Sequence, residues 1–518
     1  MPSQQNAEPE ASSRPTARLV ARNSALYFFS LALPALTAVF LVPVTVRGLG
    51  PSRFGLLALA WAVAEGSGMF DFGLGRATVR FVADATTKGR ERIRQVILAS
   101  LWSQLLAGAV AGALLFALTP IFVRRVFSIA PELHPEAIDM FRVLALHVPV
   151  LLGTTALRAS LEGAQRFDLS TALRIPSSFA SVAVPAAVVA LHGTLPTIMW
   201  TLLALRVTLL VISTEAVRRT LLGGRWALPT GFGTLREMLG YSGWVAVSAA
   251  LGPALGSLDR FVVGSVVGVA ALGYYTGAAE AATRFLLIPV TAFSALLPAL
   301  SATDSRGERA RALRVTRAAR RQLAAVMLPL CLALFAFAEP ILKIWLGSAY
   351  ANEAGAALRI LSVGVLFGGL AHLPMALLYG SGRPDLPAKV HMGEIIVHVP
   401  LTFFLVRNFG ITGAAAAWTL RCAADLTLYE WASRRALGSY QPDKAEWSRA
   451  IRLSLAAAWL AAAFAGAMWL RAGSWRAALI IAFVGVAVYV AIGWSRVFSI
   501  DERRAWIAML SRTRAPVR

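Results

Sequence analysis

The sequence predicts an all-α polytopic membrane protein with about fourteen transmembrane helices, arranged as two parallel six-helix repeats plus two C-terminal helices. The first observation is composition: 57% of the 518 residues are hydrophobic, 15% are charged, and the mean hydropathy is +0.64. Soluble proteins of this length are less apolar. The second observation is a succession of apolar runs of roughly 20 residues, the length that crosses a bilayer. The third is an internal repeat.

The repeat consists of short motifs that recur at an almost constant distance. Gly163, Arg166, Asp168 and Leu169 recur in the second half of the chain as Gly380, Arg383, Asp385 and Leu386. Other markers keep the same offset to within one residue, namely Gly50/Gly268, Gly55/Gly273, Glu136/Glu353 and Trp200/Trp418. Isolated matches arise by chance in apolar sequence, but a constant offset across several markers does not. Repeated membrane halves are typical of proteins that build a site on the axis between them.

Fourteen apolar segments give the predicted helices in chain order. They lie at residues 23–46, 54–80, 95–122, 137–161, 169–191, 195–217, 238–266, 271–299, 322–346, 355–379, 387–406, 411–432, 450–471 and 475–496. Six fall in each repeat and two follow. Because six is even, both repeats have the same orientation, and the pseudo-two-fold axis is expected to run along the membrane normal.

These segments divide the chain into four parts. Residues 1–21 are polar and rich in Ser, Pro and Ala, which predicts a disordered cytoplasmic tail. Residues 22–230 and 231–440 form the two six-helix bundles, and 441–518 hold the two extra helices and a cytoplasmic tail. Arginines precede the first apolar segment, as in a signal peptide. That segment is longer than a signal-peptide core, so we interpret it as an uncleaved helix.

The positive charges predict the orientation of the chain. The net charge of +23 could indicate nucleic-acid binding, but the arginines lie in short loops between apolar runs, the pattern of positive-inside topology. The arginine-rich loops fall between the second and third segments, after the sixth, between the eighth and ninth, after the twelfth and in the C-terminal tail. Both termini are therefore expected in the cytoplasm. We expect a multi-pass protein of the cytoplasmic membrane, with no nucleic-acid partner.

Several kinds of chemistry are excluded by the sequence. It contains no Gly-x-x-x-x-Gly-Lys-Ser/Thr phosphate loop and no His-Glu-x-x-His motif. The two cysteines, Cys331 and Cys422, both lie in apolar segments, which argues against a disulfide framework or a cysteine-rich metal site. We therefore expect no catalytic residue, no metal, no cofactor and no enzymatic activity.

The candidate functional residues are ionisable side chains inside the predicted helices. Such a residue at the centre of a bilayer costs about 2.5–3.5 kcal/mol by insertion scales, so it usually faces a cavity or a partner. The candidates for a shared cavity come from both repeats: Glu65, Asp71, Arg206, Asp259, Arg260, Glu280, Arg284, Arg421 and Asp425. Glu394 and His398 belong to the same class.

A purely structural role competes with this interpretation. Four pairs are spaced i, i+4 and could neutralise themselves on one helix face: Glu280/Arg284, Arg421/Asp425, Arg158/Glu162 and Glu394/His398. Glu65 and Arg206 have no opposite charge within four residues, so they need another helix, water or a ligand. His147 and His372 lie in apolar helices, where packing is the expected role.

Four arginines are expected at the cytoplasmic mouth: Arg76, Arg80, Arg166 and Arg383. The last two belong to the repeated Gly-x-x-Arg-x-Asp-Leu motif. Glycine suits the position after a helix and aspartate suits an N-cap, which predicts a helix-to-helix turn. The remaining interpretation is contact with an anionic headgroup.

Motifs along much of the chain resemble those of one known family. Arg22-Asn23-Ser24 opens the first segment, and residues 48–55 read GLGPSRFG. Residues 70–77 read FDFGLGRA, and Leu258-Asp259-Arg260-Phe261 precedes Gly273-Tyr274-Tyr275. Together these resemble the polysaccharide (O-antigen type) flippases of the multidrug/oligosaccharidyl-lipid/polysaccharide exporter (MOP) superfamily. The resemblance covers roughly residues 18–436.

The resemblance implies two bundles around a cationic cavity that works by alternating access. The implied cargo is an undecaprenyl-pyrophosphate-linked oligosaccharide, carried to the outer leaflet for polysaccharide biosynthesis. By analogy Asp259 and Arg260 stand at the family's position on the seventh helix, and arginines such as Arg206 line the cavity. Implied partners are membrane lipid, a coupling proton or sodium ion, a polysaccharide polymerase and glycosyltransferases. The alternative is an ion-coupled multidrug exporter of amphipathic cations. A membrane glycosyltransferase would need a large catalytic loop, which this chain lacks.

Overall fold

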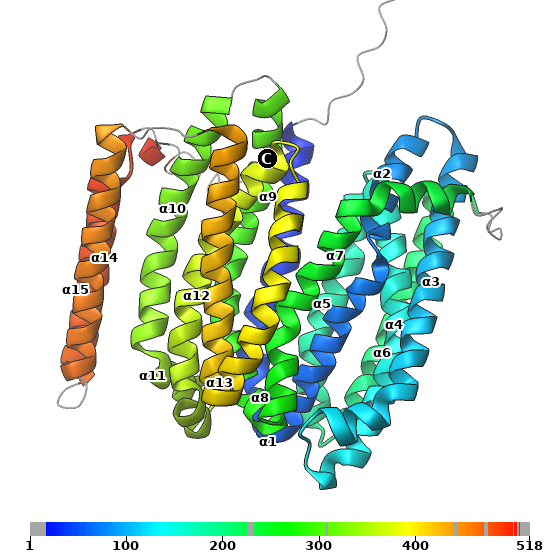
Figure 1. The fold of residues 1–518 in the computed structure, drawn as a ribbon, viewed down its shortest axis with the longest axis horizontal. Coiled ribbons are helices and arrows are strands. Elements are labelled where there is room, and N and C mark those ends of the chain that lie inside the picture. Colours follow the sequence, from blue (N-terminus) through cyan, green and yellow to red (C-terminus); the bar gives the residue numbers. More distant parts are fainter. Residues whose placement is uncertain are drawn as a thin grey trace, which may run out of the picture.

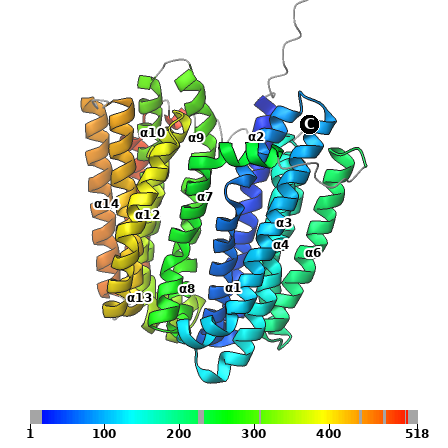
Figure 2. The same cartoon turned by 45° about the vertical axis from the view of Figure 1, so that its right-hand side comes forward.

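The computed structural model describes residues 17–224, 233–305, 309–438, 443–470, 475–500, 502–504 and 507. Every regular element in this part of the chain is a helix. The helices form two bundles and a separate hairpin, α14–α15, at one flank (Figures 1 and 2). Most of the predicted tail at 1–21, the arginine loop around Gly307 and the end of the C-terminal tail lie outside the described residues, so those expectations remain predictions.

The N-terminal half contains the first six membrane crossings. Its long helix α1 turns back at Gly50, whose φ of 70° and ψ of 172° are not helical, and so contains the first crossing and the start of the second. Glycine adopts such a φ without steric penalty. A short 3₁₀ segment, η1, and the helix α2 complete the second crossing. The elements are α1 (Ala17–Gly66), η1 (Ser67–Asp71), α2 (Leu74–Ala85), α3 (Arg90–Ile121), α4 (His134–Gly163), α5 (Phe167–Ala190) and α6 (Leu195–Thr220).

The C-terminal half repeats this plan and the hairpin follows it. Helix α13 turns back at Gly410, with φ of 58° and ψ of −135°, and therefore holds two crossings. The elements are α7 (Gly233–Val266), α8 (Val269–Thr283), η4 (Arg284–Leu286), α9 (Leu287–Ser305), α10 (Arg309–Ala336), α11 (Ala338–Trp345), α12 (Ser348–Gly380), α13 (Asp385–Leu437), α14 (Lys444–Leu470) and α15 (Trp475–Ile492).

The structure confirms the predicted all-α membrane fold. Ten helical stretches of the described chain are long and apolar enough to cross a membrane. Two of these fold back at a glycine, and α7 and the α8–α9 pair add two further crossings, which is consistent with fourteen. The bounds of one predicted helix are wrong: the segment expected at 322–346 begins at Arg309, because hydropathy detects only the part of a helix that lies in hydrocarbon.

The contacts between the halves have two-fold symmetry. A Cβ added to Gly55 would lie 1.8 Å from the Val269 carbonyl oxygen, and one added to Gly273 would lie 2.1 Å from the Pro51 carbonyl oxygen. Gly55 and Pro51 are the repeat equivalents of Gly273 and Val269. Each half therefore presents the same surface to the other, as in an isologous interface. Only glycine permits such a close backbone approach.

The repeated Gly-x-x-Arg-x-Asp-Leu turns also have matching geometry. The Arg166 amide donates to the Leu161 carbonyl at 2.8 Å, and the Arg383 amide donates to the Leu378 carbonyl at 3.0 Å. In both turns the arginine then binds the aspartate two residues later through Nε and Nη2. The bidentate aspartate raises the pKa of both arginines. These arginines are thus bound within their own turns, which supports the structural interpretation of the motif.

One region where the halves meet lies at the end of the bundle opposite the start of α1; at the other end the start of α7 packs on α2 and α3, where Arg92 pairs with Glu237. We call the end where α1 starts the terminal end and the opposite end the far end. At the far end the Ser128 amide and hydroxyl donate to the Gly264 and Ser265 carbonyls at 3.0 and 2.8 Å, and Val269 donates back to Ser128. We call these bonds, together with the Gly55–Gly273 contacts, the far-end seam. In Figure 1 this seam lies at the lower end of the molecule, where α1 and α8 are side by side.

A tryptophan reinforces the far end. Trp345 Nε1 donates to the Val39 carbonyl at 2.6 Å, across the two halves. That carbonyl has no intrahelical donor, because the residue four positions later is Pro43, which lacks an N–H. Nearby, Arg47 Nη2 lies 3.5 and 3.4 Å from the Ile344 and Trp345 carbonyls at the C-terminal end of α11. Each bond satisfies a carbonyl that the helix alone leaves unpaired.

Candidate functional site

Charged residues from both halves meet where α1 and α7 pass each other. Arg260 Nη1 of α7 lies 3.3 Å from Glu65 Oε2 of α1, and the Ser257 hydroxyl donates to the same carboxylate oxygen at 3.4 Å. The Arg260 side chain is 14% exposed, whereas that of Glu65 is 59% exposed. The partner that Glu65 requires is therefore on the other half of the molecule. We call this group, with its neighbours on α7 and α8, the junction cluster.

The remaining members of the junction cluster belong to the C-terminal half. Tyr275 of α8 donates a hydrogen bond to the buried carboxylate of Asp259. Glu280 pairs with Arg284, as their i, i+4 spacing predicts. The charges of Glu65, Asp259 and Glu280 all act on Arg260. The Arg260 guanidinium thus contacts Glu65 directly and lies within the electrostatic influence of Asp259 and Glu280, and Arg284, paired with Glu280, adds a second positive charge to the cluster.

Both halves break a helix beside this cluster. The second crossing is interrupted at η1 (Ser67–Asp71), and the eighth is interrupted at η4 (Arg284–Leu286), which starts at the equivalent position of the second repeat. Asp71 caps the helix beyond the first break, because its two carboxylate oxygens accept the Gly75 amide at 3.0 and 3.1 Å. Asp71 therefore has a local structural role. Interrupted helices in corresponding positions of two repeats are typical of transporter binding sites.

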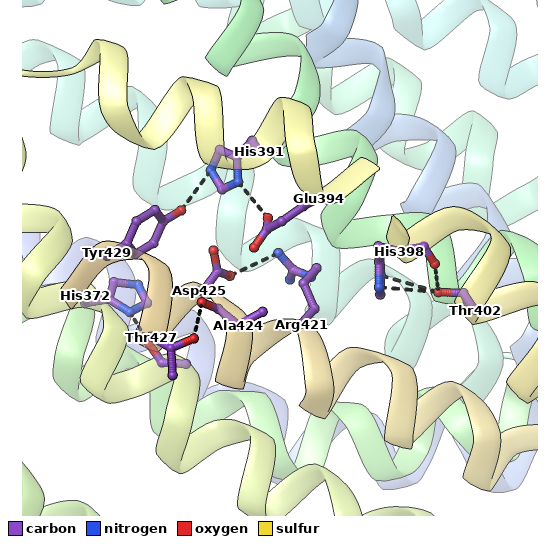
Figure 3. A network of polar contacts seen from close by, with 11 residues as sticks. His372, His391, Glu394, His398, Thr402, Arg421, Ala424, Asp425, Thr427 and Tyr429 are labelled. Carbon is purple, nitrogen blue, oxygen red and sulfur yellow. Dashed lines mark hydrogen bonds and ion pairs between the residues drawn. The ribbon is translucent and has the colours of Figure 1, made fainter. Parts of the chain in front are cut away.

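A second polar network lies inside the C-terminal bundle, between the two arms of α13 (Figure 3). His391 Nδ1 contacts Glu394 Oε2 at 3.2 Å, and the Tyr429 hydroxyl lies 3.3 Å from His391 Nε2. On the same arm as Tyr429, Arg421 lies 3.5 Å from Asp425. We call these five residues the bundle network.

The bundle network has unused hydrogen-bonding capacity. Ligand atoms of His391, Glu394 and Asp425 all lie within 4.8 Å of one another. Oxygens Oε1 of Glu394 and Oδ1 of Asp425 are buried without a hydrogen-bond partner in the described part of the chain, and so is Nε of Arg421. With the histidine neutral, two carboxylates face one arginine, which leaves one negative charge. A cation or a proton between the carboxylates would balance that charge and satisfy the free oxygens.

Some predicted pairings differ from those observed. Glu394 pairs with His391 rather than with His398, and His398 lies against Thr402 of its own arm. The i, i+4 spacing therefore found the right helix face but the wrong partner. His391 and Tyr429 were missed by the sequence analysis. Their spacing of three and four residues from Glu394 and Asp425 was the signal that could have identified them.

Arg206 lies in the N-terminal half with a histidine. Its Nη1 is 2.8 Å from His147 Nδ1, and His147 Nε2 is 3.0 Å from the Met199 carbonyl. The carbonyl accepts a hydrogen bond from Nε2–H, and Nδ1 accepts a hydrogen bond from the guanidinium. Because Nδ1 therefore carries no proton, this histidine is neutral. The two contacts explain why His147 is buried in an apolar helix, and they leave the charge of Arg206 uncancelled. The structure gives Arg206 and Arg260 different partners.

The predicted cytoplasmic-mouth arginines differ in their contacts. Arg166 and Arg383 are bound by Asp168 and Asp385, as described above. Arg76 is exposed on α2, where its charge acts on Asp71. Arg80 is on the same helix and also makes a polar or electrostatic contact.

Two six-crossing bundles related by a two-fold axis, with charge at their junction, have the architecture of a membrane transporter. The chain superposes on an inward-facing multidrug resistance MATE family transporter with a TM-score of 0.67 and 15% identity, over 81% of this chain and 98% of that one. An outward-facing MATE transporter gives a TM-score of 0.59 and 14% identity, over 83% and 99%. These likenesses establish the fold.

The chain belongs to the polysaccharide flippase family of the MOP superfamily. The family described as "Polysaccharide biosynthesis protein" matches residues 44–355, more than half of the chain. The family described as "Lipid II flippase MurJ" matches residues 237–488. A curated relative, the "Putative O-antigen transporter" of Shigella flexneri, is 26% identical over 423 residues, which are 82% of this chain and 99% of the relative.

Proposed function

We propose that this chain is a flippase, not an enzyme, that translocates undecaprenyl-pyrophosphate-linked oligosaccharide units across the bacterial cytoplasmic membrane by alternating access. The observation that carries the proposal is the match of both halves to polysaccharide and flippase families, together with a near full-length relative named as an O-antigen transporter. Glycosyltransferases would supply the cargo and a polymerase would consume it. Both termini would lie in the cytoplasm.

Physical chemistry supports the same cargo class. A pyrophosphate-sugar head is large and anionic, so it needs a polar path through hydrocarbon, while its lipid tail remains in the bilayer. Arginine binds phosphate in bidentate fashion and is rarely deprotonated. The candidate guanidinium in the junction cluster is Arg260, which pairs with Glu65 of the other half. Because Glu65 is on the other half, movement of the halves would change the partners of Arg260, as binding and release of cargo require.

Arg206 is the second candidate contact for the cargo. Its neighbour His147 is neutral, so the positive charge of Arg206 is offset by no carboxylate among its hydrogen-bond partners in the described chain. An anionic head that enters the N-terminal half could supply that charge. This proposal needs the path of the head to reach α6, which mutation can test.

The bundle network is the candidate site for a coupling ion. Its net negative charge, its buried free oxygens and the convergence of His391, Glu394 and Asp425 support binding of a sodium ion or a proton. Asp259 of the junction cluster acts electrostatically on Arg421 of the bundle network. Occupancy of the network could therefore influence the junction through neighbouring charges.

The test is display of surface polysaccharide in a flippase-null strain. Arg206→Ala and Arg260→Ala are expected to abolish display at normal protein abundance, and the lysine variants should retain part of it because they keep the charge but lose the bidentate fork. The matched control is Arg407→Ala, which removes an exposed arginine on α13. Full display by the double alanine variant would contradict this cargo site. Loss of the protein itself would favour a structural role.

The alternative is an ion-coupled multidrug exporter of amphipathic cations. It is favoured by the MATE fold alone, at 14–16% identity. Resistance to cationic dyes in an exporter-deficient strain separates the two functions. The flippase proposal predicts no gain of resistance on expression of the chain.

A further inference from the structure

We propose that a pocket at the far end of the N-terminal half binds a neutral sugar ring of the exported glycan. The pocket lies where three turns meet: the fold-back of α1 at Gly50, the first turn of α4, and the turn between α5 and α6. We call it the far-end pocket. The choice of ligand rests on the proposed function, whereas the geometry of the pocket does not.

The far-end pocket belongs to one half of the molecule. Its lining residues come from α1, α4, the end of α5 and the turn that follows α5, and none comes from the C-terminal half. Its cavity of about 400 Å³ falls within the range of small-molecule sites, which is about 300–1,000 Å³. Movement of one half relative to the other therefore does not divide this pocket, in contrast to the junction cluster.

The one guanidinium and the one carboxylate of the lining cancel each other. Arg53 Nε donates to Glu136 Oε2 at 2.8 Å, and the Leu195 amide at the start of α6 donates to Glu136 Oε1 at 3.3 Å. Nε is the only Arg53 donor with a partner in the described part of the chain, so both NH₂ groups of this 51% exposed side chain can bind a ligand. The adjacent carboxylate would repel an anion, which favours a neutral ligand.

The lining combines hydrogen-bonding groups with an apolar wall, as recognition of a sugar ring requires. Arg53 offers a planar pair of donors, while His192 and Thr194, both exposed, offer an imidazole and a hydroxyl. A sugar hydroxyl both donates and accepts hydrogen bonds, so it can pair with each of these groups. The apolar wall, on which the C–H face of a pyranose can pack, consists of Val44, Leu49, Val189 and Ala190.

His192 has a backbone conformation that glycine would adopt more easily. Its φ is 58°, in the left-handed region where glycine is usual after a helix. A non-glycine residue with such a φ is uncommon, and histidine is among the side chains that tolerate it best. The amides of His192 and Gly193 close the end of α5 on the Val189 and Val188 carbonyls at 2.9 and 2.8 Å. The turn itself gains nothing from an imidazole, so we assign this side chain to the pocket.

The second repeat forms the equivalent corner without these groups. At the offset of the nearest repeat markers, Arg53 corresponds to Ala271 and His192 corresponds to Gly410. The second repeat joins its two crossings at Gly410 within one helix, whereas residues 191–194 separate α5 from α6. Formation of this corner therefore requires neither the arginine nor the histidine, which favours a role for both in binding.

The position of the pocket matches the side on which the glycan would be released. Positive-inside topology places the arginine-rich loops in the cytoplasm and the far end on the opposite side of the membrane. A sugar ring that has left the transport path would meet the pocket there. Binding of that ring would disfavour its return through the protein.

The experiment measures saccharide binding by the full-length protein in phosphatidylcholine nanodiscs, because maltoside detergents carry sugar headgroups that would compete. Saturation-transfer NMR and thermophoresis report binding of two neutral trisaccharides, maltotriose and triacetylchitotriose, and of the anionic trigalacturonate. Ala190→Trp fills the pocket with an indole, and Arg53→Lys keeps the charge but loses the planar pair of donors. The matched control is Ala187→Trp, at an exposed position of α5 outside the lining.

We expect the wild type and Ala187→Trp to bind at least one neutral trisaccharide with the same affinity. Arg53→Lys should bind it about tenfold more weakly, and Ala190→Trp should show no binding. Absence of binding by the wild type, unchanged binding by Ala190→Trp, or an equal loss in Ala187→Trp would each overturn the proposal. Tighter binding of trigalacturonate than of both neutral saccharides would also overturn it, because the pocket would then be an anion site.

A final arm identifies the source of the sugar. The lipid-linked form of the bound trisaccharide should displace the free one, whereas phosphatidylglycerol added to the nanodisc should not. Displacement by phosphatidylglycerol, or none by the lipid-linked form, would overturn the assignment to the exported glycan. The measurement needs no transport, so a chain that binds the trisaccharide but does not translocate its lipid-linked form would contradict the flippase proposal and not the pocket.

Discussion

Glu394 and Asp425 stand out among the buried residues of the described chain, because each carboxylate keeps one oxygen without a hydrogen-bond partner. They come from the two arms of one helix, α13, and a single arginine, Arg421, offsets only one of their two charges. A buried, incompletely satisfied carboxylate is costly unless it binds something. The local chemistry therefore favours a resident cation or proton over simple packing.

The first prediction concerns Asp425→Asn. Removal of one negative charge should abolish stabilisation by sodium ions, because the remaining carboxylate is balanced by Arg421. We expect the wild-type melting temperature to rise with sodium concentration, as it does when a ligand binds only the folded state. Glu394→Gln should lose the stabilisation by sodium ions in the same way. Asp84→Asn, at an exposed pair with Lys88, is the control and should respond as the wild type does. An unchanged sodium response in Asp425→Asn would contradict the cation site.

At the residue scale, sequence reasoning found most charged groups but not their partners. Glu65 and Arg206 were expected to need another helix, water or a ligand, because no opposite charge lies within four residues of either, and each contacts a side chain of another helix, Arg260 and His147 respectively. The identity of each partner depends on helix rotation and packing, which a single sequence does not specify. His391 was missed because pairs were sought at the i, i+4 spacing, and Tyr429 was missed because a search for intramembrane charge passes over neutral hydrogen-bonding groups.

The helices show a recurring use of proline at the element scale. Pro43 of α1 and Pro329 of α10 each leave the carbonyl four residues earlier without a donor. In both cases an aromatic side chain of another helix donates the missing hydrogen bond. Trp345 donates to Val39, and Tyr489 of α15 donates to Ala325 at 3.0 Å. Proline thus leaves one backbone carbonyl of the helix free to accept a hydrogen bond from a neighbouring helix.

The attachment of the α14–α15 hairpin to α10 is the basis of the second prediction. Tyr489→Phe should destabilise the protein by about 1 kcal/mol, the typical value of an interhelical hydrogen bond in a membrane. The same change in a Pro329→Ala background should cost less, because alanine restores an amide donor for Ala325. A double-mutant cycle on the free energy of unfolding measures the difference. Equal costs in both backgrounds would show that the hydroxyl does not serve the freed carbonyl.

A second contact anchors the hairpin at the terminal end. Glu502, beyond α15, pairs with Arg321 and accepts Gln322 at 3.1 Å, while the Ser499 amide donates to it at 2.7 Å. Burial alone would raise the pKa of Glu502, but these donors outweigh it and hold the pKa below its ordinary value. None of this was visible in the sequence, because Arg321 and Glu502 lie far apart along the chain and only the packing of the hairpin on α10 brings them together.

At the scale of the whole molecule, the main result is the symmetry of the two halves. The sequence predicted the repeat from its markers, and the structure confirms it in the matching turns at Gly163 and Gly380 and in the mutual contacts of Gly55 and Gly273. Hydropathy also predicted the number of crossings. It could not predict where the two halves contact each other, because inter-bundle contacts depend on backbone approach and not on apolar content.

The third prediction tests that far-end seam. Gly55→Ala would place a methyl group 1.8 Å from the Val269 carbonyl oxygen, so the halves must separate there. We expect a shift toward a form that is open at the far end, together with lower thermal stability. Spin labels at exposed positions Phe40 and Ile344 report the separation. Gly466→Ala, where nothing lies within 4 Å, is the control. An unchanged distance in Gly55→Ala would contradict the contact.

The central claim is that the chain exposes a lipid-linked oligosaccharide first on one side of the membrane and then on the other. Transport in proteoliposomes tests it most directly, with a fluorescent lipid-linked oligosaccharide and a glycosidase that acts only from outside. In a second experiment the two halves are joined by a disulfide in the Ser128→Cys/Ser265→Cys variant, since these two residues contact each other at the far-end seam. Both native cysteines are buried, so they are not expected to compete for oxidation. We predict that the wild type makes the inner pool cleavable, and that the oxidised double variant does so only after reduction. Cleavage no faster than in protein-free vesicles, or unchanged by the cross-link, would contradict the account.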